Sequence, residues 1–324
     1  MRRKLIKQGI GALTITLPKN WTSKYGLEGG DEIEMEEHEK TLLLKTEGKS
    51  SVLAKKVIKI DNLTQSLIWR YIISAYRLGY DDIIIKFSDI EKVYDIRLSS
   101  LGVLEKKGKM GTIEVIQDVV SRCIGLEVID QGDDFCIIKD LGETSEKEFD
   151  NTVRRIFLLL LSMAEDSLEG FKNIRKNLRQ SVQSSDANID RFEDFCLRVL
   201  NKRGYKEFNK TSIIYSIILL LEFIGDEYKR IAIHHSKMKD TRISQRLTDI
   251  YENVNKLLNL YYELFHKFNE GKAIEIYEFN DRLDKDIEAS NLRLNDEEKE
   301  ILHHLKKIRR YVTDLLQLKI DLEL

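Results

Sequence analysis

Two carboxylates, Glu222 and Asp226, follow the most apolar run of the chain, residues 212–221. The run has the pattern of a buried helix, and a spacing of four residues places both carboxylates on one face of that helix. Burying two like charges is costly unless a cation or a basic partner compensates them. The spacing therefore predicts either a metal-binding face on a bundle helix or a solvated acidic strip that follows a core segment.

Four further acidic residues could complete a metal site. Glu165 and Asp166 lie on an earlier helix-forming segment, and Asp190 and Asp194, again four residues apart, lie on the next. Oxygen ligands from facing helices suit divalent cations such as Mg, Mn or Fe, and Zn is a further candidate. Each of the four residues also fits a solvated helix face, so both interpretations stay open.

The histidines occur as two adjacent pairs, His234-His235 and His303-His304. Neighbouring residues on a helix point about 100° apart, so the members of one pair rarely bind one metal together. We expect both pairs near helix ends or at the surface. The sequence has no nucleophile elbow, His-Glu-x-x-His motif or Cys–His arrangement, and a hydrolase built on the two carboxylates would lack an identifiable base. We therefore expect no enzyme.

The elements that must position these residues are helices. The periodicity predicts six of them after residue 146, at about 152–183, 189–204, 211–235, 241–268, 276–287 and 295–315. Residues 183–187 are the expected connector between the first two. Asn295, followed by Glu298, has the pattern of a capping box. A single proline, Pro18, in 324 residues agrees with long unbroken helices.

The motif Leu-Glu-x-Ile-Gly-Asp at 221–226, followed by Arg-Ile-Ala at 230–232, resembles the helix signature of PhoU, a family of phosphate-signalling regulators. That family has two three-helix repeats, each with a Glu/Asp-x-x-x-Asp pair that binds iron or other divalent metals in several members. The resemblance covers residues 146–324 and implies a metal at Glu222 and Asp226. In the second repeat, Arg310 stands four residues before Asp314, which is the spacing of a salt bridge. A generic helical bundle fits the same pattern of six helices.

Residues 1–48 follow the order strand, short helix, strand, strand, with the strands at 13–17, 32–36 and 41–45 and the helix at 19–25. So few residues rarely form an independent core, and units of this size usually need a partner. Thr14–Lys19, Asn20-Trp21 and Leu27-x-x-Gly-Asp-x-Ile33 resemble the AbrB/MazE/SpoVT swapped-hairpin domain. The resemblance implies a homodimer that presents basic residues to DNA. Leu13-Thr14 stands where bacterial members carry Gly-Arg.

Charge supports a nucleic-acid face at the N-terminus. Residues 1–24 contain no acidic residue, whereas seven acidic residues follow within 28–39. Contacts from such a basic cluster to phosphates would give salt-sensitive, largely non-specific affinity. In the alternative, the basic segment pairs with the acidic strand, and the domain only dimerises. The candidate DNA-binding residues are Arg2, Arg3, Lys4, Lys7, Lys19 and Lys24.

Residues 49–145 predict a small α+β domain. We expect helices at 63–78 and 89–101, strands at 82–87, 112–116, 125–130 and 135–139, and a helical turn at 119–122. No phosphate loop occurs there. The simplest interpretation is that this domain connects the hairpin domain to the helical part. Ligand sensing is an alternative, but no motif in the domain indicates a ligand.

Composition and charge narrow the class of protein further. The net charge is −2, and the three cysteines are scattered, which indicates reduced core residues. We expect no signal peptide and no membrane insertion, hence a cytoplasmic protein. The predicted fold class is multidomain α+β: a hairpin domain (1–48), an α+β domain (49–145) and a PhoU-like six-helix bundle (146–324). The predicted function is a dimeric, DNA-binding regulator of phosphate uptake. The alternative is an adaptor that dimerises without binding DNA and acts on a phosphate transporter or a sensor kinase.

Overall fold

The computed structural model describes residues 1–38, 40–46, 55–95, 108–142, 146–172, 178–238, 243–289 and 294–324. The chain divides into two compact units, Met1–Lys55 and Lys56–Leu324, each of which is treated by itself below. The domain boundaries expected near residues 48 and 145 both fall outside the described residues.

The N-terminal unit consists of two hairpins and one short helix. Strands β1 (Ile6–Gln8) and β2 (Ala12–Thr14) pair antiparallel, α1 spans Lys19–Lys24, and β3 (Glu34–His38) pairs with β4 (Thr41–Lys45). The predicted order of strand, helix, strand, strand is confirmed. The additional strand β1 was not predicted, and the turn before β2 depends on two glycines with φ of 69° and 91°, a region that other residues rarely adopt.

Within its described residues, the N-terminal unit has no core of its own. Among the side chains described in residues 1–46, none is buried. Large apolar side chains face solvent instead, and eight of those described in residues 1–46 are at least half exposed: Met1, Leu5, Ile6, Ile10, Leu13, Ile15, Met35 and Leu42. A two-stranded hairpin without a packed face is marginally stable in water. The unit therefore has the surface of an incomplete fold.

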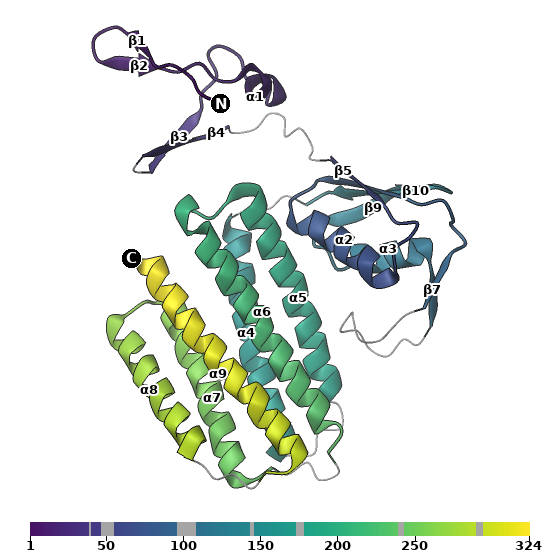
Figure 1. The fold of residues 1–324 in the computed structure, drawn as a ribbon, viewed down its shortest axis with the longest axis vertical. Helices are drawn as coiled ribbons and strands as arrows, with labels where there is room; N and C mark the ends of the chain where they lie inside the picture. Colours follow the sequence, from purple (N-terminus) through teal and green to yellow (C-terminus); the bar gives the residue numbers. More distant parts are fainter. Residues whose placement is uncertain are drawn as a thin grey trace. The chain divides into compact units, whose positions relative to one another are not determined.

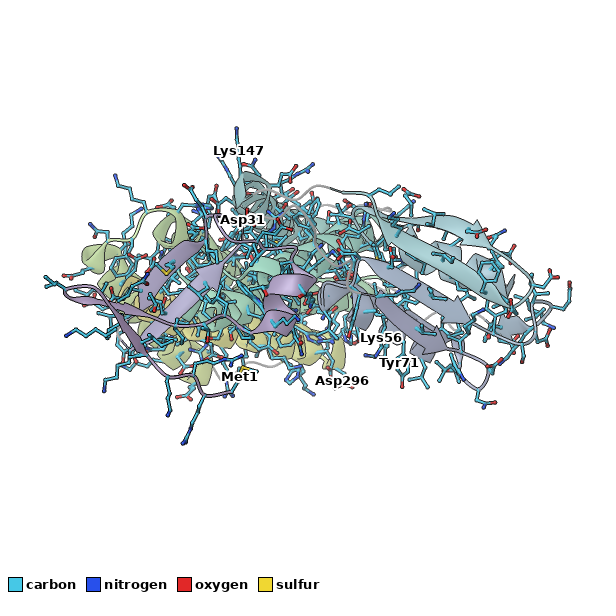
Figure 2. All side chains as sticks on the ribbon, turned by 90° about the horizontal axis from the view of Figure 1, so that it is seen from above. Met1, Asp31, Lys56, Tyr71, Lys147 and Asp296 are labelled. Carbon is cyan, nitrogen blue, oxygen red and sulfur yellow. The ribbon has the colours of Figure 1, made fainter. Side chains whose placement is uncertain are left out.

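The following α+β region is built on a sheet with strand order β5-β6-β10-β9. These strands are Lys55–Lys59, Asp82–Lys86, Phe135–Asp140 and Leu126–Gln131, and α2 (Gln65–Arg77) and α3 (Thr112–Val120) pack against the sheet (Figure 1). Figure 2 shows these strands from above, with Lys56 near the start of β5 and Tyr71 on α2. A small ribbon, β7 (Val93–Asp95) with β8 (Lys109–Gly111), completes the region.

Two predictions for this region are wrong. The helix expected at 89–101 is contradicted by strand β7, and residues 96–101 lie outside the described part of the chain. The strand expected at 112–116 is the start of α3. Its β-branched residues favour a strand locally. The apolar side chains of α3, however, continue at helical spacing to Val120, and the Gly111 N–H donates to the Glu114 carboxylate at 2.8 Å, which caps the helix.

The helical body contains six long helices in its described residues, as predicted. The first set is α4 (Glu146–Lys172), α5 (Leu178–Arg203) and, after the short turn η1 (Phe208–Lys210), α6 (Thr211–His235). The second set is α7 (Gln245–His266), α8 (Glu270–Ala289) and α9 (Asp296–Glu323) (Figure 1). The capping box at Asn295 is confirmed by reciprocal hydrogen bonds with Glu298. The connector expected at 183–187 is wrong, because these residues lie inside α5.

A buried ionic contact joins the α+β region to α5. The Arg198 side chain is 1% exposed, donates to the Tyr76 and Tyr80 carbonyls at 2.7 and 2.9 Å, and pairs with Asp140 at 2.5 Å. In addition, Arg77 of α2 pairs with the carboxylates of Glu193 and Asp194 on α5. The two regions therefore form one unit rather than separate bodies. The three cysteines are buried and free, as predicted for reduced core residues.

One described helix, residues 208–235, is long and apolar enough to cross a membrane by length and composition. It comprises η1 and α6, and α6 packs against α4, α5 and α9. Its C-terminal half carries five charged side chains. We interpret it as the central helix of the bundle.

Candidate functional site: the two charged faces of helix α6

Helix α6 changes character halfway along. Its first half, from Thr211 to Leu221, is apolar and packs into the bundle, and its second half combines buried apolar residues with carboxylates and cations. Gly225 allows close packing at the change, because a Cβ there would lie 3.4 Å from both Ile189 on α5 and Leu160 on α4. The charged residues of this half therefore lie at helix–helix contacts rather than on an open surface.

The first charged face lies between α5 and α6. Lys229 Nζ is 2.7 Å from Asp186 Oδ2 and 2.5 Å from Asp226 Oδ1, and Arg230 is 3.0 Å from Asp226 Oδ2. The negative charge expected on this face is thus balanced by basic partners of the same chain. The ammonium group of Lys229 lies between two carboxylates in the way that a bound cation would.

Two carboxyl groups of this face have strongly raised pKa values. Burial raises the pKa of Asp190 to about 8, with a further contribution from the charge of Asp186. Burial and the charge of Asp226 raise the pKa of Glu222 to about 7. Both carboxyl groups therefore favour the neutral, protonated form near neutral pH, which limits the uncompensated negative charge on this face.

The other predicted residues have different surroundings. Asp194 pairs with Arg77 together with Glu193, and so belongs to the contact between α2 and α5. On α4, Glu165 is exposed and Asp166 is half-buried, and neither is among the charges that dominate the pKa of Glu222 or Asp190. Of the six predicted ligands, the structure brings Asp190, Glu222 and Asp226 together. A metal at these residues stays a prediction.

The second charged face lies between α6 and α9, and its central group is Glu227. This carboxylate is 1% exposed, accepts from His304 Nδ1 at 2.5 Å and lies 3.5 Å from Lys307 Nζ, and it also pairs with Arg230. Burial opposes the ionisation of Glu227, but the hydrogen bond from His304 and the nearby cations outweigh it and lower the pKa. Glu227 is therefore a buried anion at the contact between the two three-helix sets.

A group of three possible metal ligands adjoins Glu227. His234, Glu300 and His304 each offer a ligand atom, and these atoms lie within 4.8 Å of one another. The group can hold a metal ion, and it was not predicted, because the histidines were considered as adjacent pairs. His234 and His235 lie in the last turn of α6, as expected for a pair near a helix end, and His235 is buried and hydrogen-bonded to the Gly170 carbonyl at 2.9 Å. In the second pair His303 is exposed, whereas His304 is buried inside α9 and does not have the expected surface position.

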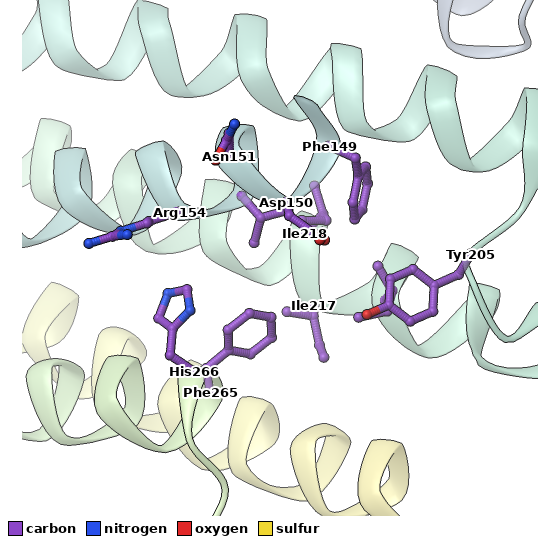
Figure 3. Close-up of a pocket in the computed structure, with 11 residues that line it drawn as sticks. Phe149, Asp150, Asn151, Arg154, Tyr205, Ile217, Ile218, Phe265 and His266 are labelled. Carbon is purple, nitrogen blue, oxygen red and sulfur yellow. The ribbon is translucent and has the colours of Figure 1, made fainter. Parts of the chain in front are cut away.

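A cavity of about 320 Å³ lies where the start of α4, the start of α6 and the end of α7 meet (Figure 3). Arg154 and His266 lie near each other at one side of it, and burial together with the charge of Arg154 lowers the pKa of His266. No sequence motif indicated this cavity. Its lining combines an apolar floor with a few polar groups: Phe149, Asp150, Asn151, Val153, Arg154, Tyr205, Ile214, Ile217, Ile218, Phe265 and His266.

No protein-family model matches the chain, and no curated protein matches it. Among solved structures, the phosphate transport system regulatory protein PhoU from Streptococcus pneumoniae is similar to the chain, with 19% sequence identity and a TM-score of 0.45. The similarity covers 55% of this chain and 94% of that chain.

Proposed function

We propose that the chain is a cytoplasmic, homodimeric regulator of phosphate uptake whose N-terminal unit binds DNA. The observation that carries the proposal is the incomplete N-terminal unit. Its described side chains include none that is buried, and its basic residues are exposed. A second copy would supply the missing core and bring two basic clusters together.

Dimerisation follows from the exposed apolar side chains. Full burial of one aliphatic side chain stabilises by about 1.5–3 kcal/mol. Leu13, Ile15 and Met35 are 50–65% exposed in the single chain. Interleaving the hairpins of two copies would cover such side chains and pair the free strand edges, which are otherwise sites of aggregation. This is the arrangement that the sequence resemblance to swapped-hairpin domains implies.

DNA binding is supported by the six N-terminal cations. All six are exposed, and within the described residues none of them forms an ion pair. Lys24 packs over the ring of Tyr25, with Nζ 5.3 Å from its centroid, and stays accessible. Cations without acidic partners are available for phosphate contacts, and release of counterions would drive the association.

Regulation of phosphate uptake is inferred from the motif at residues 221–232 and its sequence resemblance to PhoU. The motif lies on α6, which packs against α4 and α5 of the first set and against α9 of the second. A change at either charged face of α6 would therefore reach both sets. Two kinds of signal could act at this position: a bound metal ion, or a partner protein that docks on the bundle.

The adaptor that does not bind DNA is the second candidate. Leu13-Thr14, which replaces Gly-Arg, lies in and at the end of β2 and adds no cation there. In this case the N-terminal unit only dimerises, and the bundle docks on a phosphate transporter or a sensor kinase.

Fluorescence anisotropy with the full chain distinguishes the DNA-binding regulator from the adaptor. We expect binding to a random duplex that weakens steeply with salt, together with a preference for the chain's own upstream region. Alanine at Arg2, Arg3 and Lys4 should lower both the affinity and the salt slope. Alanine at Lys147, an exposed residue of α4 (Figure 2), is the matched control and should change neither. Absence of binding at low salt by a dimeric protein would favour the adaptor, and a monomer would contradict both candidates.

A further inference from the structure

The end of α6 and the first turns of α9 bring together two imidazoles and a carboxylate. We propose that His234, Glu300 and His304 bind one divalent transition-metal ion of the zinc class. The site is distinct from the carboxylate face between α5 and α6, and it does not depend on the proposed DNA binding.

The side chains and their spacing suit such an ion. Glu300 and His304 are four residues apart and share one face of α9, and His234 approaches from α6, with its ring centroid 5.4 Å from that of His304. Imidazole and carboxylate ligands are typical of zinc, which binds them at about 2.0–2.2 Å. The ligand atoms lie within 4.8 Å of one another, so a small side-chain rotation closes the site. Glu300 is exposed and His234 is half-buried, which leaves both side chains room to rotate.

Glu227 supplies an independent observation. A carboxylate can only accept, so the 2.5 Å contact requires that His304 Nδ1 carries the proton. Nε2 is then the ring nitrogen that is left to bind a metal. A buried carboxylate behind a histidine fixes the ring and raises its basicity, as carboxylate partners of metal-bound histidines commonly do. Arg230 and Lys307 hold Glu227 in turn.

Occupation of this site would connect the two three-helix sets. His234 belongs to the first set, and Glu300 and His304 belong to the second. Three protein ligands leave one coordination position of a tetrahedral ion for water or another small ligand. The ion would bind the folded chain and not the unfolded one, and so would stabilise the packing of α6 on α9.

The carboxylate face is a weaker competitor for this kind of metal. Lys229 already bridges Asp186 and Asp226 there, and oxygen-only ligands favour harder ions. The two faces can be distinguished by substitution, because they share none of their proposed ligands.

The test is titration of the full-length, chelator-treated protein with Co²⁺, followed by visible absorption, and with Zn²⁺, followed by calorimetry. We expect one equivalent to bind, and expect His234→Ala and Glu300→Gln each to weaken binding by about tenfold or more. His303→Ala is the matched control, because this neighbour is exposed on the same helix, and its affinity should be unchanged. His304 is left intact, because it is buried against Glu227 and its loss could unfold the chain.

Asp226→Asn distinguishes the two faces. Unchanged affinity in this variant supports the histidine site. Loss of binding in Asp226→Asn, with affinity retained in Glu300→Gln and His234→Ala, would overturn the inference in favour of the carboxylate face. Binding weaker than about 0.1 mM in the unsubstituted protein would overturn it as well.

Discussion

The N-terminal unit and the surroundings of helix α6 differ in whether their charged side chains have partners and their apolar side chains are buried. In the N-terminal unit, apolar side chains are exposed, and the six cations have no acidic partner among the described residues. Around α6, carboxylates are half-buried or buried, and Asp186, Asp226 and Glu227 each have a basic partner in the same chain. The first region leaves apolar side chains and cations without partners among its described residues, whereas the second pairs its charges within the chain. A proposed partner of the first region would therefore meet open surface, whereas a ligand of the second would have to compete with internal ion pairs.

The largest loss of stability is expected on removal of Arg198, the most deeply buried of the paired charges. Arg198→Ala would remove the buried cation beside Asp81 and Asp140 and leave them the partly exposed Lys202, and should lower the free energy of unfolding by about 3 kcal/mol. Arg203→Ala, at an exposed position of the same helix, is the control and should change it by less than about 0.5 kcal/mol. Urea unfolding of the full chain measures both. Equal losses in the two variants would mean that other interactions hold the α+β region against α5.

A smaller loss is expected on the carboxylate face. Lys229→Met removes the ammonium group between Asp186 and Asp226, and should destabilise by about 2 kcal/mol because the buried Asp186 loses its partner, whereas Asp226 keeps Arg230. If this face binds a hard divalent cation, Mn²⁺ or Mg²⁺ should restore part of the loss in the variant. Lys237→Met, at an exposed position beyond the end of α6, is the control. Destabilisation without any rescue by metal would limit this face to a structural role.

The same face should make stability depend on pH. In the folded chain, Asp190 has a pKa of about 8 and Glu222 a pKa of about 7. Both therefore bind protons more tightly in the folded chain than in the unfolded one, where their pKa values are close to ordinary. Their contribution is therefore fully present in acid and is lost as pH rises through 7 and 8. For Asp190 this loss is on the order of 2 kcal/mol between pH 6 and 9. The charges of Asp186, Asp226 and Lys229 act on both groups.

Unfolding measured at pH 6 and pH 9 tests this dependence. Asp190→Asn should flatten it, since the amide does not titrate. A chain that becomes more stable over this range would contradict the raised pKa of both carboxyls, and a variant that keeps the full dependence would contradict the raised pKa of Asp190.

The helices could be predicted from the sequence because each carries an apolar face at regular spacing, as in Ile301, Leu305 and Ile308 of α9. Short elements were harder. The start of α3 was mistaken for a strand because Thr112 and Ile113 are β-branched, and its helical pattern becomes clear only with Val119 and Val120.

The site was predictable only in part. Glu222 and Asp226 could be found by their spacing, whereas Lys229 was not singled out, although its spacing of three residues from Asp226 permits an ion pair on a helix. Asp186 and the His234–His304 contact could not be found in this way, because each depends on which helices pack together. The exposed apolar side chains of the N-terminal unit agree with the sequence expectation that so short a unit needs a partner.

The measurement that tests the central contrast most directly is the molar mass of the full chain in solution, by light scattering, beside the variant Leu13→Asp. We expect the unsubstituted protein to have twice the 37.9 kDa of one chain, and the variant to dissociate, because a charge at Leu13 prevents burial of the apolar face. The helical body should keep its stability in the variant. A monomeric protein with an ordered N-terminal unit would contradict the account, since that unit would then be stable without a second copy.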